Sequence, residues 1–237
     1  MTSSPLMIVG LGNPGREYAS TRHNVGRLAF DELIRQARDV GALRKKFHGE
    51  FAKGSLEGHE CIFLRPETFM NESGRSVQAA AVFFHVAPSD LVVLHDELDL
   101  PFGEIRMKLG GGHAGHNGLR SLVQDLGTPD FVRVRIGIGR PPADFAGEVA
   151  DYVLSAFSTT ERPLVQPMID RAAKMVLKIV NEGVARAMNE MNTRPKRQGE
   201  QGGAGEPQAA PPKATPSNTT NTTPRSQGEG KLRAAGI

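Results

Sequence analysis

The chain has 237 residues, 38% of them hydrophobic, and a formal net charge of +3, which is enough for one α/β domain with a hydrophobic core. Its single cysteine, Cys61, excludes an internal disulfide and a cysteine-based zinc site. No run approaches the ~18 apolar residues of a membrane-spanning helix. The first residues lack the basic region and cleavable apolar stretch of a secretory signal. These absences predict a cytoplasmic protein.

The composition changes sharply near Thr193 and predicts two regions. Residues 193–237 contain almost no large apolar side chains, so they cannot offset the entropy of ordering and are predicted to be a low-complexity, disordered tail. Residues 1–192 are predicted to form one domain. The tail from residue 195 holds six Lys or Arg and three Asp or Glu, which leaves 23 of each sign in the rest of the chain. Contacts with phosphate groups must therefore come from local clustering of basic residues.

The apolar pattern alternates between strands and helices along the chain. Strands are predicted at residues 6–11, 47–56, 60–64, 91–98, 104–109 and 131–139. Helical spacing predicts helices at residues 25–37, 73–86 and 118–126, and one long helix from about 160 to 189. The predicted fold is α/β, a single domain in which helices cover both faces of a twisted mixed β-sheet.

The motif Gly10-Leu11-Gly12-Asn13-Pro14-Gly15 follows the first strand and fits the dinucleotide-binding pattern G-x-G-x-x-G. Two features argue against a nucleotide. Asn-Pro-Gly favours a reverse turn, and the helical periodicity begins only near Arg22. The acidic residues about 20 positions on, Asp31 and Glu32, fall inside a helix instead of at a strand end.

Two residues suggest a catalytic pair. His23 stands at a helix start, where the positive end of the helix helps to keep an imidazole neutral, although a packing or capping role would also fit. Asp96 follows a buried strand, and in open α/β sheets the carboxyl ends of strands carry the ligand. A carboxylate there either caps a turn or holds a histidine in the required tautomer.

The glycine-rich stretch at residues 110–118 surrounds His113, His116 and Asn117, and its small residues let a large substrate approach the backbone. The two histidines could be metal ligands, but no further ligands with zinc spacing accompany them. Asn71 precedes a predicted helix, where it could serve as an N-cap, and the nearby Phe69 is either a core residue or an exposed stacking surface.

Five motifs together resemble the bacterial peptidyl-tRNA hydrolase family: GLGNPGREYASTRHNVG, RPETFMNESG, HDELDLPFG, KLGGGHAGHNGL and FVRVRIGIGRP. They occur in the order of that family and extend over most of residues 6–142. The resemblance implies hydrolysis of the ester between a peptide and the terminal ribose of tRNA, with no cofactor and no metal. It also implies a monomer that binds the acceptor end of peptidyl-tRNA and has no membrane partner.

The resemblance also implies a role for each site residue. His23 is the general base that activates water, and Asp96 holds and polarises it. The substrate-binding residues implied are Asn13, Tyr18, Phe69, Asn71, His116 and Asn117. Asn13 separates blocked from free aminoacyl ends, and Lys108 and Arg135 face tRNA phosphates. From the residues alone, Arg133 and Arg135 are equally well read as a solvated strand face.

Three alternatives remain open at this point: a tRNA-binding protein without catalysis, a metal hydrolase that uses His113 and His116, and a nicotinamide enzyme. For the tail, its net charge of +3 predicts weak, salt-sensitive help in RNA contact.

Overall fold

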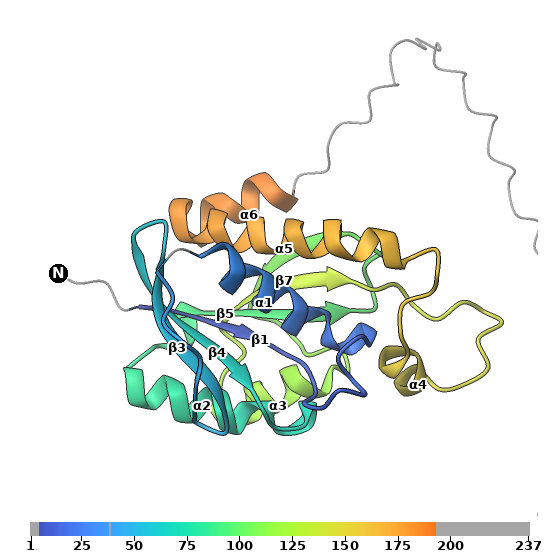
Figure 1. Cartoon of the computed structure of the whole chain (residues 1–237), viewed down its shortest axis with the longest axis horizontal. Coiled ribbons are helices and arrows are strands. Elements are labelled where there is room, and N and C mark those ends of the chain that lie inside the picture. The colour runs from blue at the N-terminus through green and yellow to red at the C-terminus, as the bar shows by residue number, and fades with distance from the viewer. Residues whose placement is uncertain (1–4, 38, 193–237) are drawn as a thin grey trace, which may run out of the picture. The chain divides into compact units, whose positions relative to one another are not determined.

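The computed structural model describes residues 5–37 and 39–192, which form one mixed sheet between two layers of helices (Figure 1). Seven strands lie in the order β2-β3-β4-β1-β5-β7-β6. They are β1 (Leu6–Gly10), β2 (Arg44–Lys46), β3 (Gly49–Leu56), β4 (His59–Pro66), β5 (Leu91–Glu97), β6 (Ile105–Leu109) and β7 (Val132–Gly137). The four central strands β4, β1, β5 and β7 are parallel, and the remaining three pair antiparallel.

Alternation along the strands creates two hydrophobic cores, one on each face of the sheet. In β1, Ile8 faces one core while Met7 and Val9 face the other. The first core is covered by α1 (Val25–Gln36), α5 (Arg162–Glu182) and α6 (Val184–Asn192), and the second by α2 (Ser73–Phe84) and α3 (Asn117–Leu126). Figure 1 shows α5 and α6 above the sheet and α2 and α3 below it. The predicted fold class is confirmed.

Three parts of the predicted secondary structure were wrong. The single long helix near the C-terminal end of the domain is two helices, because Gly183 adopts a positive φ of 78° between α5 and α6. Apolar positions continue past the break at Val184 and Ala187, so the periodic signal hides it. Phe47 and His48, predicted as strand, form a turn with positive φ before β3. The strand β2 and the short helix α4 (Val149–Leu154) were not predicted at all.

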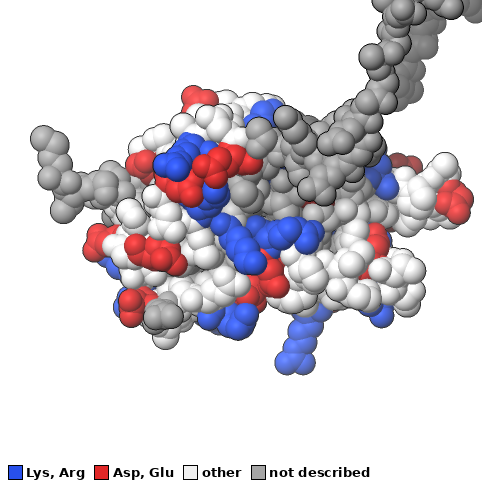
Figure 2. All heavy atoms as spheres, turned by 90° about the horizontal axis from the view of Figure 1, so that it is seen from above, with Lys and Arg blue, Asp and Glu red and all other residues white. Residues whose placement is uncertain are grey.

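The parallel strands bring their carboxyl ends to one edge of the sheet, where the connections after β1, β4 and β5 meet. Within residues 5–37 and 39–192, no helix is both long and apolar enough to cross a membrane. The surface seen from above in Figure 2 carries side chains of both charge signs. Ion pairs also join the last two helices, where Lys178 pairs with Glu182 (3.2 Å) and Glu190 (2.5 Å). The predicted tail, residues 193–237, lies outside the described residues.

Candidate active site

A cavity of about 590 Å³ opens at the carboxyl edge of the parallel strands. Segments that lie far apart in the sequence contribute to it, namely the connections after β1 and β4, the end of β5, the glycine-rich loop and α4. Its lining residues are Asn13, His23, Phe69, Met70, Asn71, Asp96, Glu97, Leu98, His113, Ala114, Gly115, His116, Asn117, Arg120, Val149, Ala150, Val153 and Leu154.

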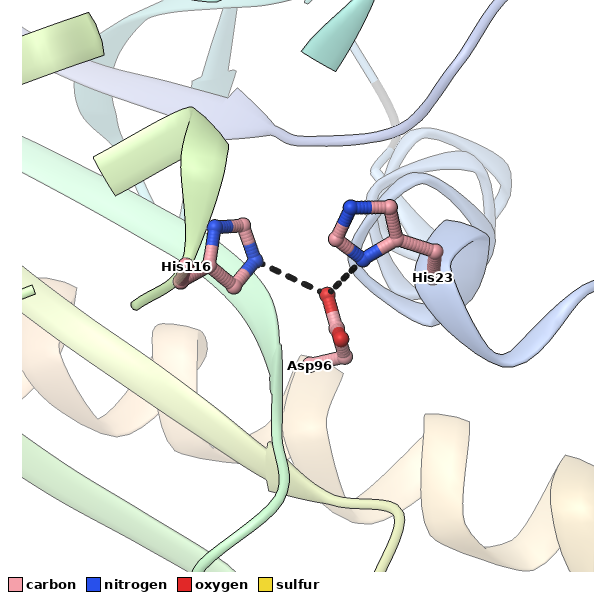
Figure 3. Close-up of side chains that lie close together, drawn as sticks. All are labelled: His23, Asp96 and His116. Carbon is pink, nitrogen blue, oxygen red and sulfur yellow. Dashed lines mark hydrogen bonds and ion pairs between the residues drawn. The ribbon is translucent and has the colours of Figure 1, made fainter. Parts of the chain in front are cut away.

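His23 and Asp96 meet inside this cavity, as the sequence analysis predicted from two separate motifs. His23 lies in a short 3-10 helix (Arg22–Asn24) directly before α1, and Asp96 is the penultimate residue of β5. Nδ1 of His23 lies 2.9 Å from Oδ1 of Asp96, and both side chains are buried (Figure 3). An ionised carboxylate can only accept, so His23 carries its proton on Nδ1, which leaves Nε2 with a lone pair.

His116 approaches the same carboxylate oxygen from the opposite side, 2.9 Å from its Nε2 (Figure 3). It is the N-cap residue of α3, and its Nδ1 accepts hydrogen bonds from the backbone N–H groups of Gly118 (3.1 Å) and Leu119 (3.3 Å). Because Nδ1 is an acceptor, the proton of the neutral ring is on Nε2 and is donated to Asp96. The helix N-terminus therefore fixes the tautomer of His116.

His23 and Asp96 shift each other's pKa, and His116 contributes to the shift of Asp96. Burial by itself would raise the pKa of Asp96, but the charges and hydrogen bonds of His23 and His116 hold that pKa well below its usual range. Burial by itself would lower the pKa of His23, but the charge and hydrogen bond of Asp96 outweigh it and raise the pKa above 6.5. The carboxylate thus stays ionised and stabilises the protonated form of His23.

His95 adds a third imidazole behind this pair. Its Nδ1 donates to the backbone oxygen of Asp96 (2.7 Å), and its ring stands edge-on to His116 with centroids 5.0 Å apart. Burial first, then the nearby charge of His116, lower the pKa of His95 to about 3. Its buried Nε2 has no hydrogen-bond partner among the residues that the structure describes. His95 is therefore a neutral ring that fixes the backbone from which the Asp96 side chain projects.

Asn13 is held with its amide oriented. Its Oδ1 accepts the backbone N–H of Met70 (2.7 Å), which leaves the NH₂ group as the polar end for a ligand. Its own backbone is clamped by the Asn24 side chain, which accepts from the Asn13 N–H (2.8 Å) and donates to the Asn13 carbonyl (2.9 Å). Since the Asn13 N–H is already bonded, it is not available to a pyrophosphate, which argues further against the dinucleotide reading.

The other two predicted asparagines lie at the mouth of the cavity and are exposed. Asn117, the first residue of α3, accepts a hydrogen bond on Oδ1 from Arg120 (2.9 Å), so it too presents its NH₂ group. Asn71 lies in the 3-10 helix Met70–Glu72, and Glu72 holds the N-cap position of α2 instead. Phe69 is 57% exposed and lines the cavity, which agrees with a stacking surface and excludes a core role.

Three of the predicted substrate residues do not line the cavity: Tyr18, Lys108 and Arg135. Lys108 is exposed on β6, and Arg135 on β7 pairs with Glu97 of the cavity wall (2.9 Å). Arg133 is buried, so the reading of a solvated strand face is wrong for it. Its guanidinium donates to the carbonyl oxygens of Gly112 (2.7 Å) and Gly111 (2.6 Å) and thereby ties the glycine-rich loop to the sheet.

Sequence reasoning missed the wall formed by α4, and it missed Arg120. A helix of six residues is too short for a periodic signal, whereas Arg120 follows Asn117 by three positions, which places both side chains on one face of α3. Arg120 could therefore have been identified from the sequence by its three-residue spacing from Asn117.

Of the two histidines proposed as metal ligands, His116 lies in a group of possible ligands and His113 does not. Among the described residues, the ligand atoms of His23, Asp96 and His116 lie within 4.8 Å of one another, whereas His113 is not in this cluster. In the tautomers described above, both ring nitrogens that face Asp96 carry protons and donate them to its oxygen. They would have to lose these protons before they could bind a cation.

The whole domain is similar to known peptidyl-tRNA hydrolases. The model of the family "Peptidyl-tRNA hydrolase" matches residues 7–199. A peptidyl-tRNA hydrolase from Sorangium cellulosum is 56% identical over 201 residues, which are 85% of this chain and 90% of the relative. One from Syntrophotalea carbinolica is 47% identical over 79% of this chain and 97% of the relative. The crystal structure of peptidyl-tRNA hydrolase from Acinetobacter baumannii matches with a TM-score of 0.73 at 42% identity, covering 81% of this chain and 96% of that one. The chain belongs to the peptidyl-tRNA hydrolase family.

Proposed function

We propose that this protein hydrolyses the ester between a peptide and the terminal ribose of tRNA by general-base activation of water. One observation carries the proposal: an oriented His23–Asp96 pair lies 2.9 Å apart inside a cavity whose rim presents amide groups. An ester needs no metal to be cleaved once water is made nucleophilic. Because tRNA is the proposed substrate, the proposal also includes a cytoplasmic location and a monomeric state.

The chemistry follows from the protonation states. Nε2 of His23 takes a proton from a water molecule while the water oxygen attacks the ester carbonyl carbon. The negative charge that develops on the carbonyl oxygen is met by an amide NH₂ group, for which Asn117 is placed by Arg120. When the tetrahedral intermediate collapses, the bond to the ribose oxygen breaks, and that oxygen receives the proton held by His23. The peptide carboxylic acid and the deacylated tRNA are the two products.

Asp96 contributes by holding His23 in the productive tautomer and by stabilising the imidazolium during the reaction. We propose that His116, as a second donor to the same oxygen, keeps Asp96 from rotating away. Its position at the N-cap of α3 links the carboxylate to the loop that carries Asn117.

Selection of blocked substrates is proposed to depend on Asn13. Its Oδ1 is occupied by Met70, so its NH₂ group, which carries a partial positive charge, would bind the carbonyl of a peptide bond in the cavity. The α-ammonium group of an unblocked aminoacyl-tRNA would lose hydration there and meet a donor instead of an acceptor. The free aminoacyl end is therefore the disfavoured substrate.

Contact with the tRNA itself is assigned to residues around the cavity. Phe69 offers an exposed ring on which a terminal base can stack, and Tyr18 is proposed for the same part of the substrate. Lys108 and Arg135 are proposed to bind phosphates, with Arg135 shared between Glu97 and the substrate. Such contacts position the substrate without reading its sequence, so many tRNAs should be accepted.

The test compares release of deacylated tRNA from N-acetyl-aminoacyl-tRNA and from the unblocked form. The native protein should cleave the blocked substrate far faster. His23→Asn, which keeps a donor near the position of Nδ1 but has no lone pair at Nε2, should lose turnover by roughly 10³-fold or more while retaining tRNA affinity. Asn13→Asp keeps the acceptor for Met70 and places a negative charge in the cavity. The ratio of the cleavage rate of the blocked substrate to that of the unblocked one should therefore fall.

The same measurements separate the rival functions. Tight tRNA binding by the native protein without release of deacylated tRNA would support the non-catalytic alternative. Unchanged turnover in His23→Asn would remove the proposed mechanism, and activity that is lost to a chelator and restored by zinc would favour a metal hydrolase.

A further inference from the structure

A buried arginine, Arg22, stands directly before the proposed base His23 and reaches across to another part of the chain. Its Nη1 donates to Oγ of Ser155 (2.7 Å), to the carbonyl oxygen of Ser155 (3.4 Å) and to that of Ala156. Its Nη2 forms an ion pair with Glu161 (2.6 Å). A guanidinium is costly to bury unless it is paired and hydrogen-bonded, so this set of partners defines its position closely.

Two aromatic rings contact the same guanidinium. The ring of Tyr152 lies 4.4 Å from its central carbon and the ring of Phe157 lies 5.3 Å away, both within the range of cation–π attraction. Arg22 is thus enclosed by the segment 152–161, and it is only 6% exposed.

The backbone reinforces this junction. The N–H of Arg22 donates to the carbonyl of Ser155 (3.1 Å), and Thr21 forms an isolated antiparallel bridge with Ala156. The chain just before His23 and the chain just after α4 therefore lie side by side.

The element held in this way is a wall of the cavity. Helix α4 has six residues, too few to be stable alone, and its last carbonyl groups need partners from outside the helix. The Arg22 guanidinium lies at this C-terminal end and donates to the carbonyls of Ser155, the C-cap residue, and Ala156, the residue after it. A positive charge there also suits the helix dipole. Further along, the hydroxyl of Tyr152 donates to the carbonyl of Ile138 (3.0 Å). The α4 residues that line the cavity are Val149, Ala150, Val153 and Leu154.

His23, by contrast, is held by contacts that do not involve Arg22. Its ring is fixed by Asp96, and the following residue, Asn24, is bonded twice to the backbone of Asn13. Removal of the guanidinium should therefore release the α4 wall while the base keeps its place.

We propose that Arg22 is a positioning residue that sets the distance between the α4 wall and the His23 side of the cavity, and so determines how tightly the acyl part of the substrate is bound. The inference rests on the proposed hydrolase function for its effect on substrate. The anchoring of α4 itself does not depend on it.

The kinetic test replaces Arg22 with methionine, which keeps the length of the side chain, together with Glu161→Gln, so that no carboxylate is left unpaired. The KM for N-acetyl-aminoacyl-tRNA should rise roughly tenfold, with kcat changed by less than about twofold, because only the fit of the bound substrate is loosened. The acid limb of the pH profile should stay in place.

Arg22→Lys, which keeps the charge but loses the planar fork, should show a smaller rise in KM. Arg171→Met is the matched control, since this exposed arginine of α5 donates to the carbonyl of Gly103 (2.9 Å) and forms no ion pair within the described part of the chain.

A rescue experiment separates anchoring from general stability. Thr21→Cys and Ala156→Cys face each other across an antiparallel bridge, within the distance that a disulfide spans. The native Cys61 is buried, and burial raises the pKa of its thiol to about 11, so it should not compete. In the Arg22→Met background the oxidised disulfide should restore KM, and reduction should raise it again.

Amide hydrogen exchange of residues 149–156 in the free protein gives a readout without substrate. Exchange should speed up in Arg22→Met and slow down again with the disulfide. A lower melting temperature with native KM and native exchange at 149–156 would overturn the proposal, as would an equal loss in kcat that the disulfide cannot restore. If the native protein were inactive, the proposed function would be refuted. The hydrogen-exchange rates at residues 149–156 would then decide by themselves whether Arg22 anchors α4.

Discussion

At the scale of single residues, the central feature is that one carboxylate oxygen accepts hydrogen bonds from two imidazole rings. Asp96 receives Nδ1–H of His23 and Nε2–H of His116, each at 2.9 Å. The two donors have different origins, since one precedes a helix and the other caps one. Of the two histidines, His23 is the one whose second ring nitrogen keeps a lone pair available, because Nδ1 of His116 already accepts backbone hydrogen bonds.

The pH dependence of hydrolysis should reveal the pairing. Only neutral His23 can accept a proton from water, so kcat/KM should fall about tenfold per pH unit below its pKa, which Asp96 holds above 6.5. In Asp96→Asn the attraction is lost and burial remains, so the acid limb should move to lower pH while the plateau rate drops by roughly 10²-fold or more. The measurement is kcat/KM between pH 5 and 9. A limb that stays in place would contradict the assigned pairing.

His95 should make the protein sensitive to mild acid. Its folded pKa of about 3 lies below the 6.5 of the unfolded state, so the unfolded chain binds more protons in that window and stability falls as the pH drops from 6.5 toward 3. His95→Asn keeps the donor to the Asp96 carbonyl and cannot be protonated. It should remove up to about 1.4 kcal/mol of that loss per pH unit. Urea unfolding at several pH values would show this, and parallel curves for the two proteins would refute it.

Part of the site could be predicted from the sequence because short motifs carry backbone information. The end of a buried strand predicted a ligand-facing Asp96, and a helix start predicted the place of His23. The expectation that the helix start keeps His23 neutral is offset by Asp96, which raises the pKa of His23 above 6.5. The contact between His116 and Asp96 could not be predicted, because it depends on how a glycine loop folds back over a strand that lies 20 residues earlier. The role of Arg22 was hidden for the same reason, since its partners follow it by more than 130 residues.

At the scale of elements, periodicity identified every long strand and helix but not the short or charged ones. The strand β2 consists of Arg44, Lys45 and Lys46, all exposed, so it has no alternation of apolar and polar residues to detect. It exists because β3 offers it a partner for backbone hydrogen bonds. The turn at Phe47–His48 that joins them uses positive φ at two residues other than glycine or asparagine, which sequence patterns disfavour.

The glycine-rich loop should depend on one buried side chain of β7. Arg133 donates to the carbonyls of Gly111 and Gly112, so Arg133→Met should free the loop that carries His116 and Asn117. We expect kcat/KM to fall by about tenfold or more, since small displacements of catalytic groups are costly. Arg35→Met, an exposed arginine paired with Glu32 on α1, is the control. Equal activities in the two variants would show that the loop holds its position without Arg133.

At the scale of the whole molecule, the charge balance makes the body of the chain neutral and leaves the net positive charge to residues 195–237. Removal of these residues should weaken tRNA binding slightly at low ionic strength and leave it unchanged at high ionic strength, because screening removes long-range attraction. Titration of labelled tRNA at two salt concentrations checks this. Equal affinities of the truncated and full-length proteins at low salt would show that the tail does not take part.

Both edges of the sheet end in strands that carry cations: β2 has three in succession, and β6 carries Lys108 beside Arg106, which pairs with Glu104. Two copies that approach edge to edge would bring these charges together before any backbone hydrogen bond could form. The strand that periodicity failed to detect therefore has a use in a crowded solution. We expect its charges to oppose the addition of a neighbour's strand to the sheet and so to limit aggregation of concentrated protein.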